Sequence, residues 1–214
     1  MMTVERLREA LQGDRDELWD RLYPQRIQEL SRSHWTPLRV ARLAAEFLVQ
    51  SPGTRVLDIG CGPGKFCLAG ALTSPGHFTG IEQRPHLHQV AQSTAAFAPS
   101  DQITFHCGNI TQVEFAPFDA FYLYNPFEEN LETLMRIDDS LSLRDELYDE
   151  YIEYVAGQLA RAPLGTRVAT YCGLCEEIPL GYDAEESPDY QRLKLWRKVR
   201  QVPLRERKSE AAVR

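Results

Sequence analysis

Two kinds of hydrophobic pattern alternate along this chain. Apolar residues at helical spacing indicate helices, and short, nearly continuous apolar runs indicate buried strands. The predicted helices cover residues 3–30, with breaks at Gly13-Asp14 and Tyr23-Pro24, then 37–50, 66–72 and 142–160. The predicted strands cover residues 56–59, 77–82, 103–110 with a turn, 118–124 and 166–172, and a hairpin of residues 182–186 and 190–199. In the last strand, Leu193 and Leu195 alternate with charged residues, as on a half-exposed sheet edge.

Thr36 and Pro37 signal the start of the helix that precedes the first strand. Threonine is a good N-cap, and proline suits the first helical position, where no N–H is needed. The preceding His34-Trp35 pair leaves two interpretations open: it lies near a ligand at the start of this helix, or it forms a hydrophobic staple. The helices of residues 3–30 likewise either cover the mouth of a cleft or pack against the sheet.

The stretch from Val56 to Lys65 joins a buried strand to a helix through a turn with glycines at positions 60, 62 and 64. Glycine permits positive φ and lets a ligand lie against the backbone. A P-loop is excluded because Phe66, not serine or threonine, follows Lys65, and a dinucleotide fingerprint is excluded because its third glycine is missing. The Asp58 carboxylate would oppose a pyrophosphate, but it suits a ligand with an ammonium group.

This D-x-G-x-G-x-G stretch resembles the class I S-adenosylmethionine-dependent methyltransferases. The resemblance implies an α/β fold, a three-layer Rossmann-like sandwich with a mostly parallel seven-stranded sheet, a C-terminal antiparallel hairpin and extra N-terminal helices. It also implies S-adenosyl-L-methionine as the cofactor, lying across the carboxyl ends of the first strands. The residues expected to hold its methionine end are Asp58, Gly60, Cys61, Gly62 and Gly64.

Two further strand ends are expected to complete the cofactor site. Glu82 follows Asp58 at about the separation at which an acid reaches a ribose diol in a βαβ nucleotide site, and the family uses the acid at this place in that way. Glu82 and the adjacent Gln83 are therefore assigned to the cofactor. After the third strand the family usually has Gly-Asp, with the acid accepting from the adenine amino group. Here Asn109 and Ile110 stand at this turn, and an amide still accepts through its oxygen, with less charge.

The fourth predicted strand leads into Asn125-Pro126-Phe127, at the place that faces the transferable methyl group in the family. The segment resembles the N/D-P-P-Y/F motif of amino-group methyltransferases but lacks the second proline. Asn125 and Phe127 are expected to contact the methyl donor or acceptor, with Tyr124 and Glu128 as candidate proton acceptors. The alternative is a structural turn at the strand end. The H-W-T-P and N-P-F segments also resemble those of uncharacterised bacterial methyltransferase-like proteins.

Composition narrows the range of partners. The formal net charge of -7 counts against a nucleic-acid substrate, because phosphate binding needs a basic surface. The five cysteines, including the C-x-x-C pair Cys172 and Cys175, are expected to be reduced core thiols. No metal site is predicted, because His86 and His88 lie on different faces of their helix. The apolar runs are too short for a membrane span and the N-terminus lacks a signal-peptide core, so a cytoplasmic protein is expected.

The predicted organisation is an N-terminal helical extension (residues 1–33), a methyltransferase domain (34–204) and a charged, disordered tail (205–214). Residues 128–141 make a long acidic loop, a candidate substrate-selecting segment. The predicted reaction is methyl transfer to a nitrogen, or an oxygen, of a small-molecule acceptor. The alternatives are a protein-lysine or nucleobase methyltransferase, and a non-catalytic binding module that retains the fold.

Overall fold

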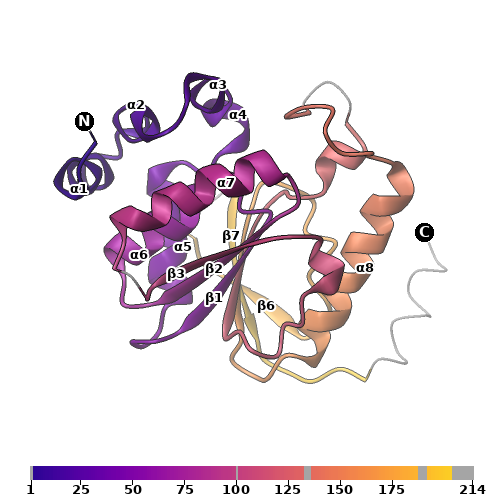
Figure 1. Ribbon diagram of the computed structural model, residues 1–214. Coiled ribbons are helices and arrows are strands. Elements are labelled where there is room, and N and C mark those ends of the chain that lie inside the picture. Colours follow the sequence, from indigo (N-terminus) through magenta and orange to yellow (C-terminus); the bar gives the residue numbers. More distant parts are fainter. Residues whose placement is uncertain (1, 100, 133–135, 188–191, 204–214) are drawn as a thin grey trace.

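A seven-stranded sheet with the order β3-β2-β1-β4-β5-β7-β6 forms the centre of the computed structural model, which describes residues 2–99, 101–132, 136–187 and 192–203 (Figure 1). Every strand runs parallel to the others except β7, which pairs antiparallel with β5 and with β6. The strands are β1 (Arg55–Ile59), β2 (His77–Glu82), β3 (Ile103–Cys107), β4 (Ala120–Tyr124), β5 (Arg167–Tyr171), β6 (Tyr182–Glu185) and β7 (Leu193–Lys198).

Helices precede the sheet and connect its strands. The α-helices are α1 (Val4–Gln12), α2 (Asp16–Trp19), α3 (Gln25–Glu29), α4 (Ser31–His34), α5 (Leu38–Leu48), α6 (Lys65–Thr73), α7 (Pro85–Thr94) and α8 (Asp145–Arg161). The 3-10 helices are η1 (Asp20–Leu22), η2 (Ala95–Phe97), η3 (Ile110–Gln112) and η4 (Glu128–Asn130). The predicted three-layer architecture and the closing hairpin are confirmed.

Each face of the sheet has its own hydrophobic core. Helices α5, α6 and α7 lie on one face and α8 lies on the other (Figure 1). Because side chains alternate along a strand, neighbouring residues of β1 belong to different cores: Val56 packs under α5 and α6, and Leu57 packs under α8. Both side chains are fully buried, as expected for a parallel sheet that is covered on its two faces.

The strand register places three strand ends at one point. Ile59 pairs with Ile81 of β2 and with Leu123 of β4, so Gly60, Glu82 and Tyr124 follow at the same edge of the sheet. The strand order changes direction between β1 and β4. Parallel α/β sheets bind ligands at such a switch point, beyond the carboxyl ends of their strands.

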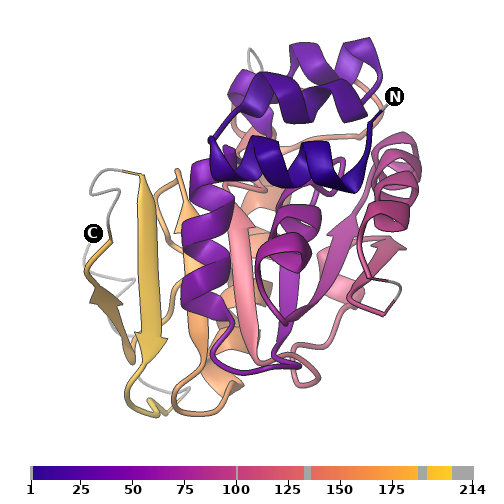
Figure 2. The same ribbon diagram turned by 90° about the vertical axis from the view of Figure 1, so that its left-hand side faces the viewer.

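The N-terminal helices lie over this carboxyl edge (Figure 2). Leu7 and Trp19 are fully buried in the same core as α5 and α6, so these helices pack on the body of the protein. An ionic cluster fastens them to α6: the Lys65 Nζ, 2% exposed, lies 2.7 Å from Asp16 Oδ1 and 2.8 Å from Asp20 Oδ1. The structure therefore supports the packing alternative for residues 3–30, whereas the segment that reaches the cleft described below is the end of α4, outside that range.

The predicted start of α5 is wrong in its details. Thr36 does not cap the helix, since its hydroxyl lies 2.9 Å from the Tyr122 hydroxyl inside the core, and Pro37 precedes the first helical residue. The capping acceptor comes from α2, where Asp16 Oδ1 accepts from the Leu38 N–H at 3.1 Å. A tertiary contact thus replaces the local cap that the sequence indicates.

Three other predictions need correction, and two lie outside the described residues. Strand β7 is not an edge strand, because it lies between β5 and β6. Helix α8 begins at Asp145, three residues later than the predicted start at residue 142. The exposed thiol of Cys107 is not a core thiol. The start of the predicted last strand (190–191) and the predicted tail (205–214) are outside the part of the chain that the structure describes.

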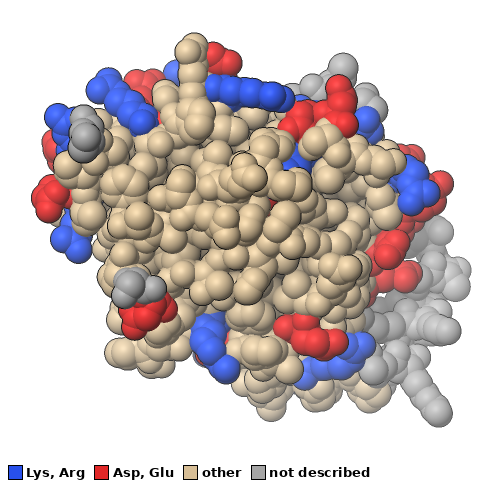
Figure 3. Space-filling model, viewed as in Figure 1, with Lys and Arg blue, Asp and Glu red and all other residues tan. Residues whose placement is uncertain are grey.

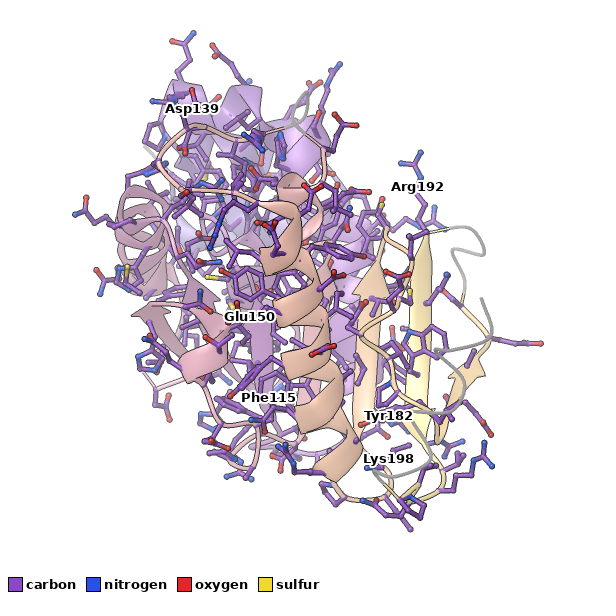
Figure 4. The ribbon with its side chains drawn as sticks, turned by 90° about the vertical axis from the view of Figure 1, so that its right-hand side faces the viewer. Phe115, Asp139, Glu150, Tyr182, Arg192 and Lys198 are labelled. Atoms are coloured by element: carbon purple, nitrogen blue, oxygen red, sulfur yellow. The ribbon has the colours of Figure 1, made fainter. Side chains whose placement is uncertain are left out.

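Lys198 of β7 joins the hairpin to the end of α8. Its buried ammonium donates to the carbonyl oxygens of Leu159, Ala160 and Ala162 at 3.2, 2.7 and 2.6 Å, and it lies over the Tyr182 ring. Figure 4 shows Lys198 and Tyr182 together at this end of the helix. A cation there satisfies unpaired carbonyl groups and complements the helix dipole, which fixes the end of α8 against the hairpin.

Candidate functional site

A cleft with a volume of about 340 Å³ opens at the carboxyl ends of β1, β2 and β4. Its walls come from the glycine turn, the ends of β2 and β4, η4 and the end of α4. A small cavity of about 20 Å³ continues beneath it toward Asp58 and Cys61. The residues that line both spaces are His34, Trp35, Gly60 and Tyr124.

The three glycines of the turn all have positive φ, as predicted: 75° at Gly60, 54° at Gly62 and 80° at Gly64. They also permit close packing within the protein. A Cβ on Gly62 would lie 2.8 Å from the Trp35 ring, and one on Gly64 would lie 2.6 Å from the Phe105 ring. A ligand against this backbone stays a prediction from the sequence, whereas the aromatic side chains that brace the turn were not predicted.

Glu82 is buried at the end of β2 and lines the cleft, where the sequence placed it. Its Oε2 accepts from the Gly62 N–H at 3.0 Å, and its Oε1 accepts from the Arg84 N–H at 2.8 Å. Burial raises the pKa of Glu82, while the N–H groups of Arg84 and Gly62 and the Arg84 charge counteract that effect. Each carboxylate oxygen has a second lone pair, so the side chain can accept further hydrogen bonds from a ligand.

Asp58 lies beneath the glycine turn, in the small cavity, and is 2% exposed. Burial raises its pKa to about 7, although a hydrogen bond from the Cys67 thiol to Oδ2 at 3.3 Å lowers it in part. A thiol is a weak donor, so this buried carboxylate has little compensation for the loss of water. A cationic group placed in the adjoining cavity would supply it.

Gln83 and Ile110 line the cleft, whereas Asn109 lies behind them. The Asn109 oxygen accepts from the backbone N–H and the hydroxyl of Thr111, both at 2.9 Å. Its amide group donates to Tyr151 Oη at 2.8 Å and to Gln83 Oε1 at 3.3 Å. An amide side chain usually forms no more hydrogen bonds than these. The role of Asn109 at the adenine stays a prediction.

The predicted catalytic residues gather on the β4 side of the cleft. Asn125 has a φ of 42°, which is unusual for a residue with a side chain, and its amide donates to Glu128. Phe127 is buried, with its ring 5.2 Å from that of Tyr151. Tyr124 donates its hydroxyl proton to the Ser33 carbonyl oxygen at 3.0 Å, and burial raises its pKa, so it is a neutral phenol.

An ion-pair cluster beside Glu82 was not foreseen from the sequence. The guanidinium of Arg84, 6% exposed, lies 2.9 Å from Glu129 Oε2 and 3.2 Å from Asp138 Oδ1. Although burial opposes it, hydrogen bonds from Ser140 and Arg84 lower the pKa of Asp138 to about 2. The cluster ties the predicted substrate-selecting segment to the end of β2. Nothing in the sequence around Arg84, two residues after Glu82, indicates these ion-pair partners.

The positions of His34 and Trp35 favour the first of the two interpretations of this pair, in which it lies near a ligand. Both line the cleft, so the pair lies at the candidate site. The indole N–H of Trp35 donates to the Ile27 carbonyl oxygen at 2.7 Å, which holds the ring over the glycine turn. The His34 ring is half-buried, and burial lowers its pKa, with Glu129 opposing and Arg84 reinforcing that effect.

In the described ranges, no group of three or more His, Cys, Asp or Glu side chains is arranged to hold a metal ion. None of the helices described is both long enough and apolar enough to span a membrane.

Part of this sequence is similar to known methyltransferases. Residues 50–146 match a family described as "Methyltransferase domain". An O-methyltransferase of Aspergillus nomiae is 33% identical over 104 residues, which are 47% of this chain and 43% of that protein. The chain thus matches less than half the length of this relative.

Two solved structures share the fold. A TehB-like SAM-dependent methyltransferase from Corynebacterium glutamicum has a TM-score of 0.53 at 15% identity, covering 85% of this chain and 98% of that one. TrmN from Thermus thermophilus has a TM-score of 0.51 at 20% identity, covering 89% of this chain and 51% of that one.

Proposed function

We propose that this chain, whose residues 50–146 match a methyltransferase-domain family, is a class I S-adenosylmethionine-dependent methyltransferase that transfers a methyl group to a nitrogen, or an oxygen, of a small-molecule acceptor. When bound, S-adenosyl-L-methionine supplies a methyl group on a sulfonium, whose sulfur is an excellent leaving group. The protein then has to bind the two reactants, hold the nucleophile in line with the methyl group and take up a proton.

The residues at the switch point fit this cofactor. Glu82 faces the cleft from the end of β2 with unused lone pairs, so we assign it to the ribose hydroxyls. Asp58 lies one strand away beside the small cavity, where its poorly compensated carboxylate suits the ammonium of the methionine end. The turn from Gly60 to Gly62 separates the two acids and lines the cleft with backbone. The position of Glu82, buried yet facing the cleft, is the observation that carries the proposal.

The acceptor is assigned to the β4 side of the cleft, where Asn125 and Phe127 stand. A non-glycine residue with positive φ, such as Asn125, persists only where its surroundings hold it, and such residues concentrate at functional sites. Its amide is oriented by Glu128, so the Asn125 oxygen remains able to accept a hydrogen bond from an acceptor group. Phe127 offers an apolar surface beside it.

The charge of the cleft favours a small molecule or a basic group over a nucleic acid. Four glutamates and one arginine are among its lining residues: Glu82, Glu128, Glu129, Glu132 and Arg84. The Arg84 guanidinium is already paired with Glu129, so little positive charge remains for a phosphate backbone. Figure 3 shows acidic side chains beside the segment that connects β4 to α8.

Replacement of Glu82 tests the donor site. We expect Glu82→Ala to weaken the binding of S-adenosylmethionine and S-adenosylhomocysteine by about 1–3 kcal/mol, because buried hydrogen-bond partners are left unpaired. Titration calorimetry measures the loss, and thermal unfolding without ligand checks that the variant folds.

Glu150→Ala is the matched control for this change. Glu150 is exposed on the outer side of α8 (Figure 4), so its removal should leave donor affinity unchanged. Equal affinity of Glu82→Ala and the wild type would reject the assignment of Glu82. Donor binding without a methylated product from any acceptor would favour the non-catalytic alternative.

A further inference from the structure

His34 occupies a position that the donor assignments leave without a role. It lines both the cleft and the small cavity that leads to Asp58, so its imidazole stands where the two spaces meet. Tyr124 and Gly60, at the ends of β4 and β1, line the same junction. The ring nitrogens of His34 form no hydrogen bond with the described part of the chain.

Contacts on both sides of His34 fix its place. The preceding Ser33 carbonyl oxygen accepts from Tyr124 Oη at 3.0 Å, and the following Trp35 ring packs against Gly62 and donates to Ile27. The end of α4 is therefore held between the end of β4 and the glycine turn. This arrangement positions in the cleft an imidazole that contacts the Trp35 ring, with 5.9 Å between the ring centroids, and whose nitrogens remain without a hydrogen bond to the described part of the chain.

The groups around His34 set its protonation. Burial and the Arg84 guanidinium lower its pKa, and Glu129 opposes them. Tyr124, also at the junction, is a neutral phenol, and Glu82, Glu128 and Glu132 line the same cleft. A lowered pKa keeps most of the imidazole neutral near pH 7, so the ring can accept a proton.

On the basis of the proposed methyl transfer, we propose that the acceptor is an amine that arrives as its ammonium ion and gives a proton to His34. The N–H bond of the ammonium breaks, its electron pair stays on the nitrogen as the nucleophilic lone pair, and a new N–H bond forms on the imidazole. The positive charge moves from the ammonium to the imidazolium, so charge and protons balance.

The glutamates of the cleft explain why a cation would enter. Glu128 and Glu132 are exposed at the cleft, and Glu128 lies within hydrogen-bond reach of Asn125. A carboxylate wall attracts an ammonium ion and disfavours an acid or a phosphate. Tyr124 is a poorer proton acceptor than His34 because a neutral phenol already donates its proton to Ser33.

The first test uses defined acceptor probes and measures both the methylated acceptor and S-adenosylhomocysteine. We would use benzylamine, 2-phenylethylamine and 1,4-diaminobutane, each with the alcohol of the same skeleton. Methylated amine and S-adenosylhomocysteine are expected from the amines, and the alcohols should give neither. The protein–S-adenosylhomocysteine complex should bind the ammonium probes, and Glu128→Gln with Glu132→Gln should weaken that binding at least threefold.

The second test separates a proton acceptor from a structural residue. We expect His34→Gln to lower kcat about 100-fold, the lower end of general-base effects, while the affinity for S-adenosylhomocysteine stays within twofold. In the wild type, kcat should fall as the pH falls through the pKa of His34, and His34→Gln should lose this dependence. His106→Gln, on the exposed side of β3, is the matched control and should behave as wild type.

Nuclear magnetic resonance of the His34 ring supplies a readout that needs no turnover. Addition of an ammonium probe to the S-adenosylhomocysteine complex should shift the His34 ring signals and leave those of His106 in place.

Several outcomes would overturn the inference while leaving the donor site intact: no methylated amine, alcohols preferred to amines, an unchanged pH profile in His34→Gln, or unmoved His34 signals. Failure of the wild type to bind S-adenosylhomocysteine would instead overturn the proposed function.

Discussion

At the residue scale, two buried acids lie on neighbouring strands, Asp58 on β1 and Glu82 on β2, and their hydrogen-bond donors differ. Glu82 accepts from two backbone N–H groups, whereas Asp58 accepts from a single thiol. Burial raises the pKa of both carboxylates, and at Asp58 the single thiol donor offsets this effect only in part, so that its pKa rises to about 7. The glycine turn thus separates the acid that we assign to the ribose hydroxyls from the acid that we assign to the ammonium group.

Asp58 should make the stability of the ligand-free protein depend on pH. In the unfolded chain its carboxylate titrates near 3.8, and in the folded protein near 7. Between these values the folded state holds a proton that the unfolded state has released, so stability decreases as the pH rises. The asparagine variant cannot lose stability in this way. Between pH 4.5 and 7 we therefore expect the free energy of unfolding of Asp58→Asn, relative to that of the wild type, to increase by about 1–3 kcal/mol.

Urea unfolding at a series of pH values measures this effect. Asp149→Asn, on the exposed side of α8, is the control and should follow the wild type. The same pH dependence in Asp58→Asn and the wild type would contradict the raised pKa.

At the scale of elements, α6 links the glycine turn to the N-terminal helices through Lys65. Its ammonium lies between Asp16 of α2 and Asp20 of η1, and it donates to Ser31 of α4 at 3.2 Å. The first residue of the helix that follows the glycine turn therefore joins three N-terminal elements. The turn and the α4 end that carries His34 share one support.

Removal of this cation should destabilise the protein. We expect Lys65→Met to lower the free energy of unfolding by about 3 kcal/mol, because the buried Asp20 carboxylate loses its counter-charge. Denaturant unfolding gives the value. The control is Lys194→Met on the exposed side of β7, for which a change below about 0.5 kcal/mol is expected. Equal effects of the two substitutions would refute this role of Lys65.

The sequence predicts elements whose signals are local. The second strand was predicted at residues 77–82 and lies there, and the positive φ values of the glycine turn follow from residue type. What the sequence missed depends on contacts between distant residues. Asp16 caps a helix that starts at Leu38, and β7 inserts beside β5 instead of staying at the edge. Neither relation leaves a periodic pattern in the chain.

The same distinction applies to the site. The position of Glu82 at the cleft could be predicted because its strand and its spacing from Asp58 are visible in the sequence, and its role at the ribose stays a prediction. Arg84 and its partners were missed because Glu129 and Asp138 approach it only in the folded chain. The resemblance of the H-W-T-P and N-P-F segments to bacterial methyltransferase-like proteins stays a prediction.

At the scale of the whole molecule, the N-terminal helices and the sheet form one packed unit. Trp19 is fully buried, and it belongs to the core that includes Phe66 and Phe78. The predicted boundary between residues 33 and 34 marks a change in architecture from helices to sheet, and it stays a prediction as a domain boundary.

Deletion of residues 1–30 should therefore cost more than an ordinary surface change. We expect a loss of more than about 5 kcal/mol, because Leu7 and Trp19 leave the core and Lys65 loses its partners. Thermal unfolding followed by circular dichroism measures it. Arg32→Ala, which removes only an ion pair with exposed partners, is the control. A truncated chain with the wild-type midpoint would show that the helices are dispensable.

The bond between Tyr124 and Ser33, together with the Trp35 ring on Gly62, has a consequence for protein engineering. Consider a hybrid protein in which a segment of another protein replaces residues 1–35. It would keep every strand and the glycine turn, but it would lack one wall of the cleft. Under the proposed function, the choice of acceptor should then depend on the first 35 residues as much as on the loop after β4. Libraries that diversify both segments together are the natural route to new acceptors.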